Sequence, residues 1–148
     1  MAVLDRVSAI LKQKGGQISS IAPNVTVYEA LEMMANREIG ALLVMDNGRL
    51  VGLLSERDYA RKIILKGRSS RETKVDEIMI SPPITISSEC SVDQAMRIMT
   101  ESRIRHLPVI RADGSVAGIV SIGDLVKWII TSQDETIDHL QSYIAGQA

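Results

Sequence analysis

Two serine–aspartate pairs are the residues of this sequence with the clearest chemical use. Ser55 stands three residues before Asp58, and Ser121 stands three residues before Asp124, each where an apolar run gives way to a helical pattern. A carboxylate at a helix start can accept hydrogen bonds from the cis-diol of a ribose, and the serine hydroxyl and free amides can meet ribose or phosphate oxygens. The ordinary alternative is a helix cap. Repetition of the pair favours a nucleotide site, with capping as a second role.

Basic side chains near these pairs are the candidates for phosphate binding. Arg57 lies inside the first pair, where the second copy has Gly123. Arg105 and His106 precede the apolar run Leu107–Ile110, and a planar guanidinium can bind two phosphate oxygens. The alternatives are a solvated helix end for the arginine and a structural role for the histidine.

An internal repeat explains why the pair occurs twice. When Ile21 is placed against Ile86, matching residues continue through both copies with one extra residue near Asp113. The matches include Val27 with Val92, Ala30 with Ala95, Met34 with Met99, Leu42 with Leu107, Gly52 with Gly118 and Ile63 with Ile129.

Each copy is predicted to fold as β-α-β-β-α, because apolar residues alternate between strand and helical spacing. Capping boxes at Thr26–Glu29 and Ser91–Gln94 predict the helix starts. The expected strands are Gly16–Ile21, Ala41–Met45 and Leu50–Leu54, then Ile84–Ser87, Leu107–Ile110 and Val116–Val120. The expected closing helices are Glu56–Leu65 and Gly123–Thr131, with shorter helices at Val3–Leu11, Val75–Met79 and Glu135–Ile144.

The predicted fold class is therefore α/β, of the α+β type, with two tandem repeats packed sheet to sheet. One repeat alone would bury too little surface for comfortable stability, so the two should share a core. The expected division is residues 1–70, the first repeat with the N-terminal helix, and residues 71–148, the second repeat with the C-terminal helix.

Composition narrows the class of protein. The net charge is −1 and aromatic residues make up 3%, which argues against a nucleic-acid-binding surface. There is no secretory leader, and runs such as Ala41–Met45 are too short to cross a bilayer, so we expect a cytoplasmic protein without membrane contact. His106 and His139 are far apart and Cys90 is alone, so we expect neither a metal site nor a catalytic nucleophile.

The chain resembles the cystathionine-beta-synthase (CBS) domain family, as a stand-alone tandem pair. The resemblance rests on Gly52-Leu53-Leu54-Ser55-Glu56-Arg57-Asp58, on Gly118-Ile119-Val120-Ser121-Ile122-Gly123-Asp124, and on the segment Ile104–Val109. It implies a pseudo-twofold axis between repeats and clefts for AMP, ADP, ATP, NAD(H) or S-adenosylmethionine. In these clefts Ser55, Asp58, Ser121 and Asp124 would hold ribose, and strands near Ile21, Thr85 and Ile86 would form the adenine slot. Plain core positions are the alternative for Ile21 and Ile86.

The expected function is that of a regulatory signal-transduction sensor that binds an adenine nucleotide and acts in trans on a protein partner. We expect a homodimer, no required cofactor and no catalytic residue, and hence not an enzyme. Two alternatives stay open. One is a structural or nucleic-acid-associated scaffold without a small ligand, and the less favoured one is a nucleotide hydrolase, for which Asp58 and Asp124 are the only carboxylates in place.

Overall fold

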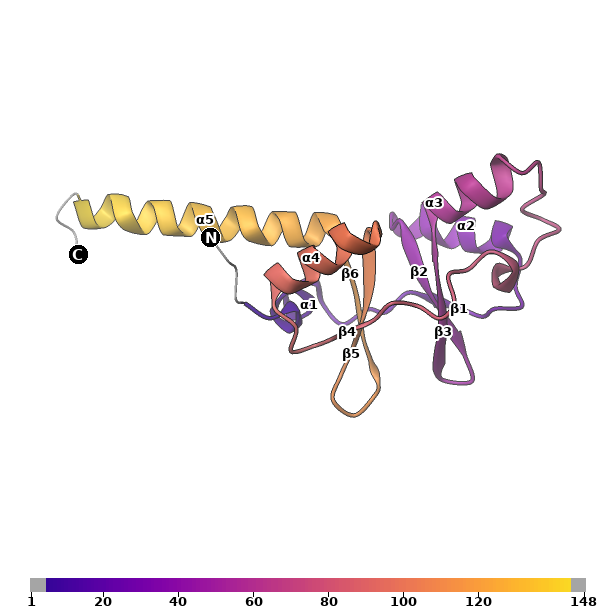
Figure 1. Cartoon of the computed structure of the whole chain (residues 1–148), viewed down its shortest axis with the longest axis horizontal. Helices are drawn as coiled ribbons and strands as arrows, with labels where there is room; N and C mark the ends of the chain where they lie inside the picture. Colours follow the sequence, from indigo (N-terminus) through magenta and orange to yellow (C-terminus); the bar gives the residue numbers. More distant parts are fainter. Residues whose placement is uncertain (1–4, 145–148) are drawn as a thin grey trace. The chain divides into compact units, whose positions relative to one another are not determined.

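The computed structural model describes residues 5–144, without the side chains of residues 134–140, 142 and 143 in the last helix. Contacts divide the chain into two units. The first-repeat unit comprises Gln17–Thr85, and the second-repeat unit comprises the chain from Ile86 onward together with the N-terminal segment through Gly16. Both units contain the order strand, helix, strand, strand, helix, and the second-repeat unit also holds the indigo N-terminal helix (Figure 1).

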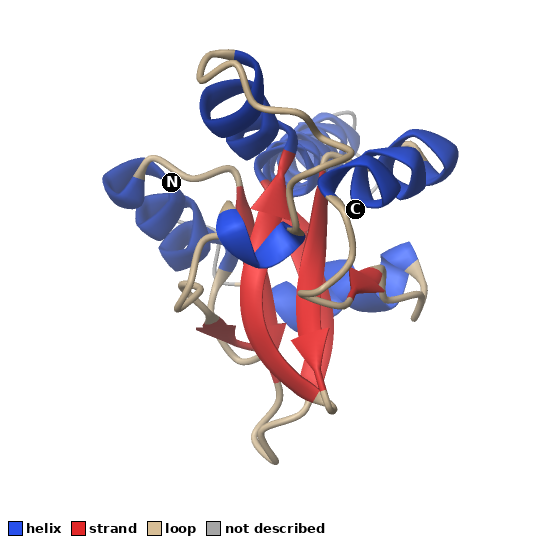
Figure 2. Ribbon diagram, turned by 90° about the vertical axis from the view of Figure 1, so that its right-hand side faces the viewer, coloured by secondary structure: helices blue, strands red, loops and turns tan. Residues whose placement is uncertain are grey.

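The first-repeat unit is built on a three-stranded sheet of order β1-β2-β3. Strand β1 pairs in parallel with β2, and β2 pairs antiparallel with β3, so that the two long strands form the twisted hairpin seen in Figure 2. Its elements are β1 (Ser20–Ile21), α2 (Val27–Arg37), β2 (Ala41–Asp46), β3 (Arg49–Ser55), α3 (Glu56–Tyr59), the π-helical turn η1 (Ala60–Ile64) and the 3-10 turn η2 (Val75–Glu77).

The second-repeat unit has a sheet of order β4-β5-β6 with the same parallel and antiparallel pairings. Both hairpins shift register at the matching place, between Val44 and Met45 and between Val109 and Ile110. Its elements are α1 (Val7–Lys14), β4 (Ile86–Ser87), α4 (Val92–Ser102), β5 (His106–Ile110), β6 (Val116–Ser121) and α5 (Ile122–Ile144).

Local signals account for most element boundaries. At the start of α2 the Thr26 hydroxyl accepts a hydrogen bond from the Glu29 amide at 3.2 Å, and at the start of α4 Ser91 accepts one from Gln94 at 3.1 Å. These are the N-cap halves of the two predicted capping boxes. In the β2–β3 turn, Asn47 and Gly48 have φ of 50° and 77°, the left-handed conformations that a two-residue hairpin turn requires.

The matching sheets and element orders confirm the predicted α+β class and the tandem repeat. The buried apolar residues form one cluster in each unit, whereas a single shared core was expected. The first core contains Ile21, Val27, Ala30, Met34, Leu42, Val44, Leu54, Ile63, Val75 and Ile78. The second contains Val7, Ile10, Ile86, Cys90, Val92, Ala95, Met99, Leu107, Val109, Val120 and Leu125. Repeat-matched residues such as Met34 and Met99, each 2% exposed, occupy equivalent places.

The N-terminal helix differs from the expected division at residue 70. Helix α1 packs in the second-repeat unit, where Val7 is 0% exposed and Ile10 is 3% exposed within its core. Residues 71–85 likewise belong to the first-repeat unit, because Val75 and Ile78 are buried in that core. Periodicity shows that a helix has an apolar face, but it does not say which repeat covers that face.

The closing helices also differ from their predicted bounds. The two helices expected at Gly123–Thr131 and Glu135–Ile144 form one continuous α5, since neither glycine nor proline interrupts residues 124–144. In the first-repeat unit the expected single helix is α3 followed by η1. Strands β1 and β4 are shorter than expected. Of the helices between residues 5 and 144, none is long and apolar enough to cross a bilayer.

Candidate functional site

The Ser55–Asp58 pair of the first-repeat unit forms a complete capping box at the start of α3. Asp58 Oδ2 accepts hydrogen bonds from the Ser55 amide and hydroxyl, both at 2.9 Å, and the Asp58 amide donates to Ser55 Oγ at 3.3 Å. Both residues are buried, at 9% and 7% exposure. The ammonium of Lys62 lies 3.6 Å from the other carboxylate oxygen, Oδ1. The cap thus occupies Oδ2 and leaves Oδ1 facing a cation.

The Ser121–Asp124 pair repeats this geometry at the start of α5. The Ser121 amide donates to Asp124 Oδ2 at 2.8 Å, and the Asp124 amide donates to Ser121 Oγ at 3.1 Å. Here the cation comes from far along the chain, because Lys14 of α1 donates to Asp124 Oδ2 at 2.7 Å. Lys14 also donates to the Ile119 carbonyl at 3.1 Å, so its ammonium connects α1 to both β6 and α5.

The surroundings of Asp124 lower the pKa of its carboxyl below the ordinary value of 3.8. Burial by itself would raise this pKa, since it disfavours the charged form. The hydrogen bond and charge of Lys14, together with the hydrogen bonds from Ser121, outweigh the burial. Asp124 is therefore an anion at neutral pH, as a ribose acceptor must be.

The phosphate candidates are divided between the two units. Arg57 is half-buried in α3 beside the first pair. His106 is the first residue of β5 and lies directly opposite Ser121 of β6, so their side chains share one face of the sheet. Arg105 is exposed, and its carbonyl accepts the Ile122 amide at 2.8 Å. The structure thus brings the basic pair of the second repeat next to the Ser121–Asp124 cap.

The positions of the adenine-slot candidates do not distinguish ligand binding from core packing. Ile21 and Ile86 lie in the cores of their own units, at 9% and 5% exposure, so core packing alone accounts for both side chains. Thr85 is exposed at the end of the first-repeat unit. The adenine slot stays a prediction.

The comparisons with known proteins match both repeats. The model of the CBS domain matches residues 16–65 and 75–131. This chain belongs to the CBS domain family. Its relatives include the mitochondrial CBS domain-containing protein CBSX3 of Arabidopsis thaliana, which is 42% identical over 95% of this chain and 72% of that protein.

Solved structures of CBS proteins share the fold as well. A proposed signal-transduction protein with CBS domains from Burkholderia ambifaria MC40-6 has a TM-score of 0.83 and 45% identity, over 87% of this chain and 96% of that one. A hexameric CBS-CP12 protein from bloom-forming cyanobacteria has a TM-score of 0.75 and 25% identity, over 83% of this chain and 67% of that one. This chain is thus a tandem CBS protein, and the family is one of regulatory modules.

Cys90 of the second CBS repeat is placed for packing. It is 9% exposed in the core, and its sulfur lies 3.5 Å from the Ser91 carbonyl oxygen. Burial raises the pKa of the Cys90 thiol, which keeps it protonated and a weak nucleophile at neutral pH. Within the described part of the chain, no group of three or more His, Cys, Asp and Glu residues is arranged to hold a metal ion.

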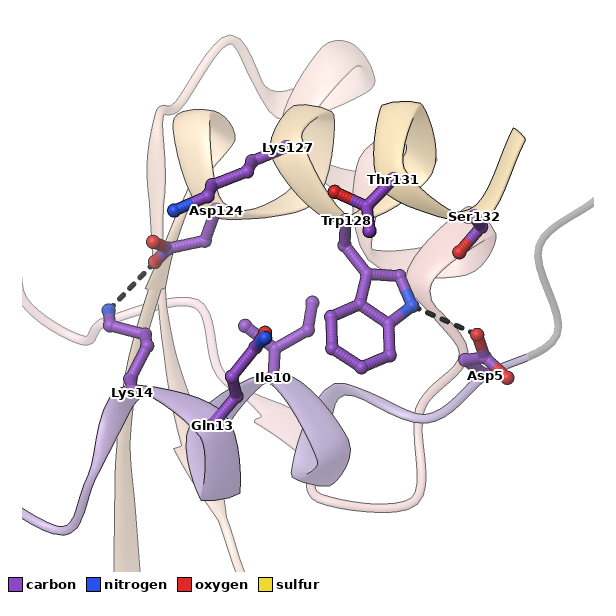
Figure 3. Close-up of a pocket in the computed structure, with 9 residues that line it drawn as sticks. All are labelled: Asp5, Ile10, Gln13, Lys14, Asp124, Lys127, Trp128, Thr131 and Ser132. Carbon is purple, nitrogen blue, oxygen red and sulfur yellow. Dashed lines mark hydrogen bonds and ion pairs between the residues drawn. The ribbon is translucent and has the colours of Figure 1, made fainter. Parts of the chain in front are cut away.

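A pocket between α1 and α5 of the second CBS unit escaped the sequence analysis (Figure 3). Its walls include Lys14 and Ile10 of α1 and Asp124 and Trp128 of α5, and the Trp128 indole N–H donates to Asp5 Oδ2 at 2.9 Å. The sequence analysis assigned the N-terminal helix to the first repeat, so it did not predict a contact between Lys14 and Asp124. One sequence feature could have predicted this contact: α1 ends with the basic residues Lys12 and Lys14, and α5 begins with the acidic Asp124.

Proposed function

We propose that this CBS protein is a regulatory sensor that binds an adenine nucleotide, with ribose held by Asp58 or Asp124. The observation that carries the proposal is that each helix cap uses one oxygen of its aspartate carboxylate. In both caps the hydrogen bonds from the serine go to Oδ2. These cap bonds do not use Oδ1, and at Asp58 the Lys62 ammonium faces that oxygen at 3.6 Å. One oxygen can therefore hold the helix start while the other accepts from a ribose diol, so capping and ligand binding are compatible roles.

The remaining parts of the site support the same ligand class. His106 lies opposite Ser121 across the hairpin, and Arg105 directly precedes it, so positive charge is available for a phosphate near the second cap. The first CBS repeat has Gly40 and Ala41 at these positions and offers Arg57 instead. Under this proposal the two sites bind AMP, ADP, ATP or NAD(H) with different phosphate preferences.

The output of the sensor is proposed to be a contact with a partner protein, and the protein itself is proposed to be a homodimer without catalytic activity. Ile64 and Ile130 are repeat-matched residues of the closing helices, and they are 58% and 53% exposed. Matched apolar side chains exposed in both repeats suit a self-complementary interface. Light scattering at micromolar concentration tests the dimer, and a monomeric mass would contradict it. We keep the cytoplasm as the proposed compartment, which cell fractionation would test.

The experiment for the nucleotide site is a thermal-shift series with AMP, ADP, ATP, NAD, NADH and S-adenosylmethionine. It compares the wild type with Asp58→Ala and Asp124→Ala, each against its own ligand-free midpoint. A ligand at about 100 times its Kd stabilises the native state by about 2.7 kcal/mol, so binding gives a clear rise.

The matched controls are Thr26→Ala and Ser91→Ala, which remove N-caps of other helices and leave the Asp58 and Asp124 carboxylates in place. We expect at least one aspartate variant to lose the ligand shift while both controls keep it. No shift with any ligand in the wild type would remove the nucleotide site and leave the two pairs as helix caps. Turnover of a nucleotide by the pure protein would favour an enzyme instead.

A further inference from the structure

The pocket between α1 and α5 has the size of a small-molecule site. Its volume is about 350 Å3, within the range of roughly 300–1,000 Å3 that is usual for ligand pockets. The residues that line it all belong to the second-repeat unit. The pocket is therefore complete within one unit.

One end of the pocket is basic. Figure 3 shows Lys14, Lys127 and Asp124 together at this end. Lys14 is paired with Asp124, at 2.7 Å. Among the side chains that the structure describes, none forms a hydrogen bond or an ion pair with the exposed Lys127 ammonium. This end thus offers one uncompensated positive charge, which would attract an anion.

The middle of the pocket has an apolar side, beside the polar Gln13. Ile10 of α1 and the Trp128 ring of α5 face it (Figure 3). The hydrogen bond from the indole nitrogen to Asp5 Oδ2, at 2.9 Å, holds the ring at the end away from Lys14, and Asp5 places its negative charge there. A ring held by such a bond is a ready surface for a flat ligand, because little motion is lost on binding.

We propose that this pocket binds a small organic anion, whose flat apolar body packs on Trp128 and whose acidic group meets Lys127 and Lys14. The site goes beyond the proposed nucleotide site but shares Asp124 with it. An anion that draws Lys14 away from Asp124 leaves Oδ2 with the hydrogen bond from the Ser121 amide, so the carboxylate becomes a stronger acceptor for a ribose at Oδ1. This second step rests on the proposed function, and by linkage a nucleotide at Asp124 would in turn favour the anion.

The test uses phenyl phosphate as the probe and the fluorescence of Trp128 as the readout. Trp128 is the single tryptophan of the chain, so its emission reports on this pocket alone. We expect a saturable change with phenyl phosphate, and a Kd about tenfold weaker in Lys127→Gln, which loses a charge-assisted hydrogen bond. Lys12→Gln is the matched control on α1, because Lys12 is exposed and does not line the pocket.

Two further probes separate the parts of the ligand. Inorganic phosphate lacks the flat body and benzyl alcohol lacks the charge, so each should bind at least tenfold more weakly than phenyl phosphate. Equal binding of inorganic phosphate, no saturable change with phenyl phosphate, or wild-type affinity in Lys127→Gln would each overturn the site. A doubling of mass by light scattering during the titration would show that a second copy covers the pocket, which also overturns it.

The coupling is measured separately, as the Kd for AMP with and without saturating phenyl phosphate. We expect phenyl phosphate to tighten AMP binding about fivefold, at the low end of usual coupling between sites. Lys14→Gln should bind AMP tightly from the start and lose most of this effect. Weaker AMP binding in the presence of phenyl phosphate would overturn the coupling. If AMP does not bind at all, the nucleotide proposal fails, while the phenyl phosphate titration still decides the pocket.

Discussion

In each CBS unit a segment from outside the repeat is bound by backbone hydrogen bonds beside one helix start, that of α2 in the first unit and that of α4 in the second. The two segments are held in the same way but then continue differently. Residues 73–80 fill this place in the first-repeat unit, and residues 5–14 fill it in the second. The four matching bonds are Val27 N to Thr73 O at 2.8 Å and Val75 N to Val25 O at 2.9 Å in the first unit, and Val92 N to Asp5 O at 2.8 Å and Val7 N to Cys90 O at 2.9 Å in the second.

Beyond these bonds the segments diverge. In the first unit a single 3-10 turn is followed by extended chain, and Ile80 exchanges two backbone hydrogen bonds with Leu53 of β3, at 2.8 and 3.0 Å. In the second unit the segment continues as α1, and the carbonyl of Ile119 in β6 accepts the Lys14 side chain at 3.1 Å instead. The edge strand β3 is therefore paired by the backbone of Ile80, whereas the edge strand β6 is bonded by the side chain of Lys14.

Local sequence explains why one segment is extended and the other is helical. This difference changes which cation lies beside each candidate carboxylate. Pro82 and Pro83 disfavour a helix after Ile80, whereas Lys12-Gln13-Lys14 has good helix formers up to Gly15. The helix carries Lys14 to Asp124, whereas the matching Asp58 faces Lys62 of the adjoining turn η1 at 3.6 Å. The difference teaches that repeated motifs can keep the same cap and still differ in what controls their carboxylate.

The largest expected effect tests whether the two segments are equivalent parts of their cores. Ile78→Ala and Ile10→Ala remove matched side chains that are 1% and 3% exposed. Each should lower the free energy of unfolding by about 2–5 kcal/mol, from lost burial and the cavity left behind. Urea unfolding followed by circular dichroism measures both. Ile144→Ala, at an exposed position, is the control and should stay within about 0.5 kcal/mol of wild type.

That comparison has a clear failing result. If Ile10→Ala changed the free energy of unfolding as little as Ile144→Ala, helix α1 would not belong to the second core. The Lys14–Asp124 contact would then lose its structural basis.

An intermediate effect separates the two caps. Ser55→Ala removes a buried hydroxyl that donates to Asp58 Oδ2 at 2.9 Å and accepts the Asp58 amide. The Ser121 hydroxyl accepts the Asp124 amide in a more exposed pair, and its own hydrogen bond is the smallest of the causes that lower the Asp124 pKa. Within the usual range of about 0.5–2 kcal/mol for N-cap loss, Ser55→Ala should lie near the top and Ser121→Ala near the bottom. Denaturant unfolding measures both losses. The threonine variants keep a hydroxyl and should recover most of the stability, and a larger loss at Ser121 would reverse the ranking.

The smallest expected effect concerns Lys14 and Asp124. Because folding lowers the pKa of Asp124, the unfolded chain takes up the proton more readily. The resulting stabilisation is complete above the ordinary pKa of 3.8 and is lost as the pH falls through the lower folded-state pKa. Asp124→Asn and Lys14→Gln should therefore both weaken the dependence of unfolding free energy on acid pH.

A double-mutant cycle gives the size of this interaction. The Lys14 and Asp124 side chains are 39% and 23% exposed, so solvent screening should limit the coupling to about 0.5–1 kcal/mol and salt should reduce it further. Lys12→Gln is the control and should keep the wild-type acid dependence. An unchanged acid dependence in both Asp124→Asn and Lys14→Gln would show that the ion pair is absent in solution.

Much of the fold could be read from short stretches of sequence. Thr26, Ser91, Ser55 and Ser121 all cap helices where their spacing predicted, and the Asn47-Gly48 turn has the expected left-handed conformation. These features depend on residues three or fewer positions apart, so local geometry decides them. The repeat then transfers each assignment from one copy to the other. The predicted roles of these residues toward a ligand stay predictions.

Contacts between distant segments could not be read in this way. Lys14 and Asp124 are 110 residues apart, and Asp5 and Trp128 are 123 apart. An amphipathic helix such as α1 has an apolar face that fits either of two similar repeat cores, and periodicity is the same in both cases. Local spacing thus defines the two caps and the strands that present them. The cation beside each carboxylate, and the pocket beside Asp124, depend on which core buries Val7 and Ile10, and that choice arises only when the whole chain packs.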